Sequence, residues 1–516
     1  MFNISANAVP GQDGKFGAAT PGRAVRLVIP VLAAALGGCT VLVPDRNVPE
    51  VVSRLPETFP VAQEAPGTYR PRAWWHGFED NTLNALVDEA LDQNLDLAEA
   101  AARVERASAQ AHVARASLFP SISAGAGSNY SDTSTAGTPI GKFANLDRLR
   151  SETYSLSLGA SYEVDLFGRA RSNQLARRAD ARAAEHDFRA VQLATAAETI
   201  ATYFEIVDTR RQIELALVTA DVLADRVERT EERYLRGLVE SYELYQVRQE
   251  LRTAQAALPL REETLDAAEG RLAVLLRDYP QEIEKKIAGP LHPRLDFSPV
   301  PAGLPVGLLA QRPDVAAAWE RLDAARLTIG ARRAERFPAI SLSGSIGTQG
   351  DTPGAAFKTA QNWALTLASN IVAPIFDGGR IAANVAVARA DYDARAAAYA
   401  RAVLEAYREV TSATEQYEEE RQRYRLILAQ LADAEASLDL QARRFGSGVG
   451  SYIAYLDSLR AVYQVRASLS AAARGVALAR LGVHRALAGD WTSDRKLAPV
   501  AMSKDASRGS ATESTP

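Results

Sequence analysis

The sequence predicts a chain that combines very long α-helices with four strands of a transmembrane β-barrel, which several copies of the chain must complete together. Three observations predict this fold: a unit that occurs twice, two long segments almost free of proline and glycine, and short segments of alternating apolar and small polar residues. The composition agrees, because alanine is abundant and only 7% of the 516 residues are aromatic. Such a balance favours long helices with small residues at their contacts.

The charge balance and the histidines argue against several classes of function. Lys and Arg (59) nearly equal Asp and Glu (63), and the net charge of −4 gives no basis for a nucleic-acid partner. The five histidines share no metal-ligand spacing, and no H-E-x-x-H motif occurs. We therefore predict no catalytic residue, no metal site and no enzymatic activity.

Residues 1–38 have the features of a signal peptide. Two arginines, Arg23 and Arg26, precede the apolar run Leu27–Leu36. This run is too short to span a bilayer, which needs about 20 apolar residues, so it is typical of a cleaved targeting segment. No other apolar run in the sequence is long enough for a transmembrane helix, and a membrane span would therefore have to be built from strands.

The end of this segment, Leu36-Gly37-Gly38-Cys39, resembles the lipobox of bacterial lipoproteins, whose cysteine is acylated after cleavage. Cys39 is the only cysteine, so it cannot form a disulfide within the chain. The resemblance implies a covalent lipid on Cys39 and no other cofactor, with residues 39–73 as an extended anchored segment. Thr40 in place of an aspartate implies the outer membrane.

The chain contains two copies of one unit. Phe119-Pro120 and Phe337-Pro338 lie 218 positions apart, within similar segments at 94–123 and 312–341. Further on, Arg169 and Arg380, at the ends of DLFGR and FDGGR, lie 211 positions apart. A constant offset that changes once indicates an internal repeat. We place the copies at 74–290 and 291–491, followed by a tail, 492–516, whose composition predicts disorder.

After each Phe-Pro pair the pattern becomes that of a strand. In the second copy Ile340, Leu342 and Ile346 alternate with serines and glycine, and residues 154–164 alternate in the same way. One apolar and one small polar face is the pattern of a transmembrane barrel strand, although a soluble hairpin would show it too. The Gly/Ser-rich stretch Ser131–Lys142 is expected to be the loop between the first two strands. Four strands cannot close a barrel, so copies must pool them.

Long helices are predicted over residues 170–235 and 381–445. At about 1.5 Å per residue, each would be about 100 Å long. In the second helix apolar residues recur at every seventh position, which indicates coiled-coil-like packing; they are Val403, Val410, Tyr417, Tyr424, Leu431 and Leu438. Each helix ends at a glycine-containing turn, and a second helix returns.

These motifs together resemble the outer membrane factor (TolC-like) family, and within it the lipoprotein branch of resistance-nodulation-division efflux systems (NodT/OprM-like). The matching segments include WWHGFEDNTLNALVDEALDQNLDL (74–97), YEVDLFGR (162–169), GLPVGLLAQRPDV (303–315) and FGSGVGSYIAYLDSLR (445–460). The resemblance implies a homotrimer whose chains each give four strands to a 12-stranded barrel. A long periplasmic α-helical barrel would continue from it.

The resemblance also implies a periplasmic gate. The family's narrowest rings, an apolar residue and an aspartate one helical turn later, match Ile453 and Asp457, which the i, i+4 spacing puts on one helix face. Three aspartates would form an acidic ring that favours cations. The first copy offers Gln246 at the matching place after one inserted residue. The turn residues expected to contact an adaptor protein are Gly237, Leu238, Val239, Gly448, Val449 and Gly450.

The function that this resemblance implies is the exit duct of a tripartite efflux system in the bacterial outer membrane. Its partners would be two further copies of the chain, a periplasmic adaptor protein, an inner-membrane pump and outer-membrane lipid. Two alternatives remain open at this point: a type I protein-secretion channel with the same fold, and a lipid-anchored coiled-coil scaffold without a pore. The alternating strands argue against the scaffold, which would not need them.

Overall fold

A computed structural model of the chain describes residues 42–45, 49–56, 59, 74–136, 139, 147–288, 291, 300, 306–358 and 362–487. The predicted signal peptide (1–38), Cys39 and the tail 492–516 lie outside the described residues. The chain forms two compact units. The strand unit contains Met1–Pro44, Ser117–Ser172 and Ile329–Val385, and the helix unit contains Asp45–Ala116, Asn173–Thr328 and Ala386–Pro516. Each unit takes segments from both copies of the repeat, so the units do not coincide with the predicted division at 290.

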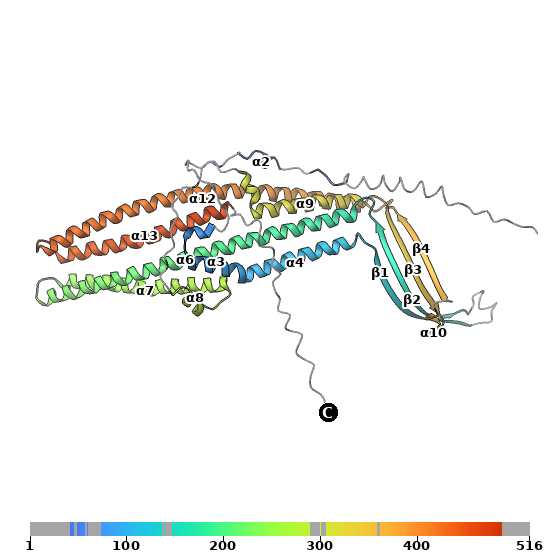
Figure 1. The fold of residues 1–516 in the computed structure, drawn as a ribbon, viewed down its shortest axis with the longest axis horizontal. Helices are drawn as coiled ribbons and strands as arrows, with labels where there is room; N and C mark the ends of the chain where they lie inside the picture. Colours follow the sequence, from blue (N-terminus) through green and yellow to red (C-terminus); the bar gives the residue numbers. More distant parts are fainter. Residues whose placement is uncertain are drawn as a thin grey trace, which may run out of the picture. The chain divides into compact units, whose positions relative to one another are not determined.

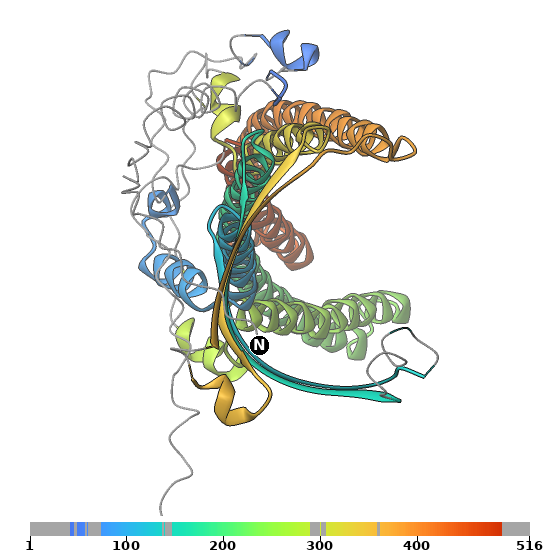
Figure 2. The same cartoon turned by 90° about the vertical axis from the view of Figure 1, so that its right-hand side faces the viewer.

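The strand unit is one antiparallel sheet in the order β1 (Ser121–Ser134), β2 (Arg148–Val164), β3 (Ala339–Gly350) and β4 (Trp363–Val372) (Figure 1). A short helix, α10 (Pro353–Ala356), lies between β3 and β4 in the sequence. Figure 2 shows that the sheet is strongly curved. The four predicted strands are confirmed.

The first strand is longer than the sequence predicts. Ser131–Ser134 continue β1 and pair with β2, where a loop was expected. Asp132 lies opposite Arg150 and forms ion pairs with Arg148 (2.9 Å) and Arg150 (3.4 Å). These cross-strand charge pairs favour pairing at residues of low intrinsic strand preference.

The register separates the side chains into two faces. On one face lie apolar rows that run across all four strands, for example Ala124, Leu158, Ile346 and Leu365. On the other face lie small or polar rows, for example Ser123, Gly159, Ser345 and Thr366. Leu158, Ile346 and Leu365 are about half exposed. The apolar face of the sheet is therefore uncovered within one chain.

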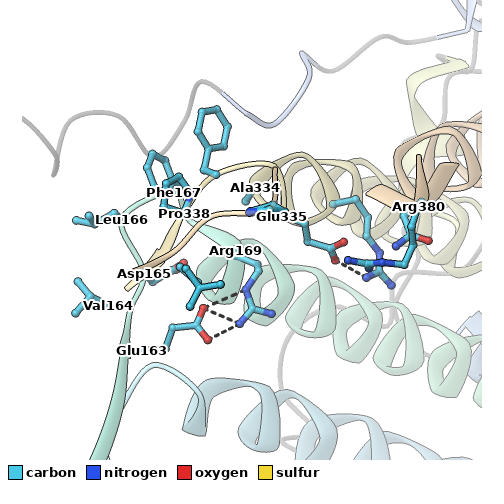
Figure 3. A pocket seen from close by; sticks show the side chains of 16 residues that line it. Glu163, Val164, Asp165, Leu166, Phe167, Arg169, Ala334, Glu335, Pro338 and Arg380 are labelled. Atoms are coloured by element: carbon cyan, nitrogen blue, oxygen red, sulfur yellow. Dashed lines mark hydrogen bonds and ion pairs between the residues drawn. The ribbon is translucent and has the colours of Figure 1, made fainter. Parts of the chain in front are cut away.

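The DLFGR and FDGGR motifs are strand-to-helix turns. Asp165 accepts hydrogen bonds from the backbone N–H groups of Ala170 (3.1 Å) and Arg171 (2.8 Å) at the start of α6, and Asp377 accepts them from Gly379 (3.0 Å) and Ile381 (2.9 Å) at the start of α12. A carboxylate at a helix N-terminus satisfies otherwise unpaired N–H groups. Arg169 also pairs with Glu163 at the end of β2, as Figure 3 shows.

The helix unit is built mainly from two helical hairpins, the first of α6 and α7 and the second of α12 and α13, with shorter helices beside them (Figure 1). The described helices are η1 (Trp74–Phe78), α2 (Glu50–Ser53), α3 (Asn81–Gln93), α4 (Leu95–Ala116), α6 (Arg169–Leu235), α7 (Ser241–Leu276), α8 (Pro280–Lys286), η2 (Val306–Gln311), α9 (Pro313–Ala334), α12 (Arg380–Gly446) and α13 (Tyr452–Ala486). The long helices α6 and α12 confirm the predictions over 170–235 and 381–445. None of the helices in the described part of the chain is long and apolar enough to cross a membrane.

Two apolar clusters form the core of the helix unit. The first joins α3, α6, α7 and α8 around Tyr203, whose hydroxyl donates to Asp80. Burial, and then this hydrogen bond, raise the pKa of Tyr203 above its usual value. The second cluster includes Val403, Val410 and Tyr417, which are at most 3% exposed. The predicted seven-residue period therefore marks the packed face of α12.

Arg312 of the RPDV sequence joins three helices of the second cluster. Its guanidinium is 8% exposed and pairs with Asp314 (2.8 Å) on α9 and Glu409 (2.7 Å) on α12. It also donates to the carbonyl oxygen of Ala486 (2.9 Å) at the end of α13. A buried guanidinium with three acceptors fixes the ends of these helices, because losing one partner would leave an uncompensated charge.

Candidate gating site

Both long hairpins turn in the same way. Gly237 and Gly448 have φ values of +70° and +77°, in the left-handed region that glycine adopts without strain. The next residue in each turn donates to a carbonyl five positions back: Leu238 to Arg233 (2.9 Å) and Val449 to Arg444 (3.0 Å). This is the Schellman pattern of a helix C-terminus. The repeat has therefore preserved one turn structure in both copies.

The turns carry exposed apolar side chains. Leu238 is 64% exposed and Val449 is 75% exposed, while Val239 is half-buried. Gly450 leaves no room for a side chain, because a Cβ there would lie 2.7 Å from the backbone nitrogen of Phe445. The predicted adaptor-contact residues thus form two small, rigid tips, each with one apolar side chain in solvent. Figure 1 shows both turns at the same end of the helix unit.

The predicted gate residues begin helix α13. The Ser451 hydroxyl caps this helix by accepting from the N–H of Ile453 (3.2 Å). Ile453 is half-buried, and the Asp457 side chain, one turn further, is 49% exposed. Both residues are therefore on a well-defined helix immediately after the second tip.

Asp457 is the first member of a chain of alternating charges. Its Oδ1 lies 2.8 Å from Nη1 of Arg226 on α6, and the same nitrogen lies 3.3 Å from Glu250 on α7. Glu250 also pairs with Arg460 on α13 (2.7 Å). We call these four residues the charge chain. It joins α13 to both helices of the first hairpin, and Arg226, 12% exposed, is its most buried member.

A second connection lies closer to the tips. The hydroxyl of Tyr452 donates to Oδ2 of Asp225 on α6. Arg229 reaches the same carboxylate oxygen (3.2 Å), and its guanidinium lies 4.4 Å from the centre of the Tyr452 ring. A cation over an aromatic face adds to the charge-assisted bond. The start of α13 is thus held to α6 at two levels.

The sequence did not reveal these partners. It placed Asp457 in an acidic ring, but within one chain the carboxylate is already paired with Arg226, 231 positions earlier. Arg226, Asp225, Glu250 and Tyr452 were all missed, because pairs between different copies leave no mark in the repeat. Gln246, the first copy's counterpart, lies with Glu250 along a cavity of about 640 Å³ between α6, α7 and α13.

Nothing in the described part of the chain has the arrangement of a metal site. No group of three or more His, Cys, Asp or Glu side chains comes together among those residues. The acidic residues of the candidate site are instead paired with arginines.

The comparisons with known proteins identify the family. A family model described as outer membrane efflux protein matches residues 86–276 and 304–489. The chain belongs to this family. It is 28% identical to the pyoverdine export outer membrane protein OpmQ of Pseudomonas aeruginosa over 82% of this chain and 89% of that protein. It is 30% identical to the solvent efflux pump outer membrane protein SrpC of Pseudomonas putida over 89% of this chain and 96% of that protein.

A solved structure agrees with the sequence relatives. The open state of the MtrE outer membrane channel of Neisseria gonorrhoeae superimposes with a TM-score of 0.74, at 26% identity, over 87% of this chain and 98% of that chain. The predicted family, fold class, channel function and outer-membrane location are confirmed. The chain is an outer-membrane channel component of an efflux system.

Proposed function

We propose that three copies of this chain form the exit duct of a tripartite efflux system, completed by a periplasmic adaptor protein and an inner-membrane pump. The observation that supports this most directly is the sheet. Among the described strands, β1 and β4 each have one edge with no partner strand in the chain, and the apolar face of the sheet is uncovered. In lipid, unpaired strand edges cost several kcal/mol per backbone group, so neighbouring copies must supply the missing partners. Pooling four strands from each of three chains gives a 12-stranded barrel.

Transport through this duct is passive, and the chain catalyses no reaction. The pump supplies the energy, and this chain supplies a path and a gate at Ile453 and Asp457. The apolar tips, Leu238 and Val449, are suited to contact an adaptor protein, because exposed apolar side chains on rigid turns lose little entropy on binding. The names of OpmQ and SrpC, pyoverdine export and solvent efflux, favour small molecules as cargo over secreted protein.

This function is tested with the purified chain in detergent and in planar bilayers. Native mass measurement is expected to give three times the mass of the mature chain, which is slightly below the 55.5 kDa of the full sequence. Reconstitution is expected to give discrete conductance steps. A monodisperse, water-soluble monomer would contradict the proposal, since four strands cannot close a barrel alone.

We also propose that Cys39 carries a covalent lipid. Cells fed a labelled fatty acid are expected to label the wild-type chain and not the Cys39→Ser variant. The variant should still insert as a trimer, because the sheet has its own apolar face. The absence of label on the wild-type chain would show that the lipoprotein assignment is wrong.

A further inference from the structure

A short segment just after Cys39 in the sequence lies against helix α9 in the strand unit. Leu42, Val43 and Pro44 are all half-buried there. Arg333 Nη1 donates a hydrogen bond to the carbonyl oxygen of Leu42 (3.1 Å). An interaction with the backbone carbonyl of Leu42 holds the main chain itself in place, whatever its side chains.

Val43 occupies the space that a side chain at position 330 would need. A Cβ built on Gly330 would lie 2.6 Å from Cγ2 of Val43 and 3.3 Å from its Cα. The hydroxyl oxygen of Ser172 would lie 3.4 Å from the same atom. Gly330, Arg333 and Ser172 therefore form a notch that receives Val43.

Neither the helix nor a turn accounts for a glycine at position 330. It lies inside α9, where glycine destabilises a helix by about 1 kcal/mol relative to alanine. Its φ is not in the left-handed region, so no turn requires it. In the first copy of the repeat the matching position, 218 residues earlier, is His112. Only one copy has the notch, as expected if it serves the single N-terminal segment.

We propose that this notch is the docking site that fixes the N-terminal anchor, so that the lipid on Cys39 enters the membrane beside the helix-proximal end of the sheet. The inference rests on the lipidation proposed above. Two residues lie between Cys39 and Leu42, so the Cα atoms of these two residues are at most about 11 Å apart. From Gly330 to the end of α9 at Ala334 the helix rises about 6 Å, and β3 begins at Ala339. The lipid on Cys39 would therefore enter the same leaflet as the end of the sheet, where Val164, Ile340 and Ile371 form an apolar row.

The first test is a pair of engineered cysteines in the full, membrane-inserted chain. Val43→Cys with Gly330→Cys is expected to form a disulfide within one chain on mild oxidation, because the two positions adjoin and Val43→Cys removes the branched side chain whose Cγ2 a Cβ at 330 would meet at 2.6 Å. Acylated Cys39 offers no competing thiol. The matched control is Val43→Cys with His112→Cys, which uses the equivalent position in the first copy and is expected to remain reduced. Peptide mapping of the oxidised chains identifies the bond.

The second test blocks the notch. Gly330→His introduces the residue of the first copy and is expected to displace Val43, so that thermolysin cleaves on the N-terminal side of the half-buried Leu42 about tenfold faster. Gly270→His is the control, because Gly270 also lies inside a helix but nothing lies within 4 Å of a Cβ built there. This control should be cleaved at the wild-type rate.

The two tests separate docking from lipidation. A disulfide in a chain that takes up labelled fatty acid supports the proposal. No disulfide between positions 43 and 330, or an unchanged cleavage rate in Gly330→His, would overturn the docking site while leaving the lipoprotein assignment intact. A disulfide in a chain that takes up no label would show that the segment docks but anchors no lipid, and the proposed lipid placement would fall.

Discussion

Replacing Arg226 by methionine is expected to raise the resting conductance of the reconstituted channel by about tenfold. Among the described residues, Arg226 is the one cation of the charge chain that lies between Asp457 and Glu250. Without it, Asp457 loses the arginine that neutralises its carboxylate, whereas Glu250 keeps its ion pair with Arg460. Removing one partner of a buried pair costs about 3–5 kcal/mol. Because Asp457 is half exposed, solvent screening reduces this to the roughly 1.4 kcal/mol that shifts a closed–open equilibrium tenfold.

The control for this experiment is Arg252→Met. Arg252 is also an arginine of the first hairpin, but it is exposed and bonds only to nearby Gln255 among the contacts described for it. Its replacement should leave the conductance unchanged. In the Arg226→Met background, Asp457→Asn should restore part of the closed state, because it removes the carboxylate that the first substitution leaves without an arginine. Equal conductance of Arg226→Met and the wild-type channel would show that the charge chain does not hold the gate closed.

The sequence predicted most of the fold because its patterns are local. The alternation around Ile340 fixed which face of the strand is apolar, and the seven-residue recurrence from Val403 fixed the packed face of α12. Both periods follow from the geometry of one element. The error at Ser131–Ser134 has the same origin. Composition indicated a loop there, whereas ion pairs with Arg148 and Arg150 on the neighbouring strand support a longer β1.

The candidate site was predictable only in part for the opposite reason. Gly237 and Gly448 are local signals, since a Schellman turn requires a residue with positive φ. The position of Asp457 came from a motif. Its partner Arg226 is one of many charged residues on a long helix, and nothing in the sequence distinguishes it from its exposed neighbours. Only the approach of α6 to α13 selects that arginine.

The repeat also predicts how neighbouring chains pair in the proposed trimer. Matching residues of β1 and β3 are 218 positions apart, and matching residues of β2 and β4 are 211 apart. The structure keeps both offsets, because Ser121 pairs with Ser161 in the first copy and the matching residues, Ala339 and Val372, pair in the second. Within the chain, Val164 pairs with Ile340, so β2 and β3 partners have numbers that sum to 504. Replacing β2 by its counterpart β4 adds 211 to this sum, and replacing β3 by its counterpart β1 subtracts 218. Partners between β4 and the next chain's β1 should therefore sum to 497.

Two further features of the strands agree with this register. It places Trp363, the first residue of β4, opposite Ser134, the last residue of β1. It also places Ile371 opposite Ala126, which lies on the same apolar face. A shift by one residue would put apolar side chains opposite the polar face, which is disfavoured wherever one face meets lipid.

Cysteines placed by this register are expected to link three chains covalently. Ser369→Cys with Ser128→Cys should give oxidised trimers that survive denaturation and return to monomers on reduction, because directly opposed residues lie within disulfide range. The control pair, Ser369→Cys with Ala124→Cys, lies on the same face but four residues out of register, about 13 Å along the strand. It should remain monomeric on a denaturing gel. Cross-linking of the control pair, with none for the first, would mean that the chains meet in a different register from that of the repeat.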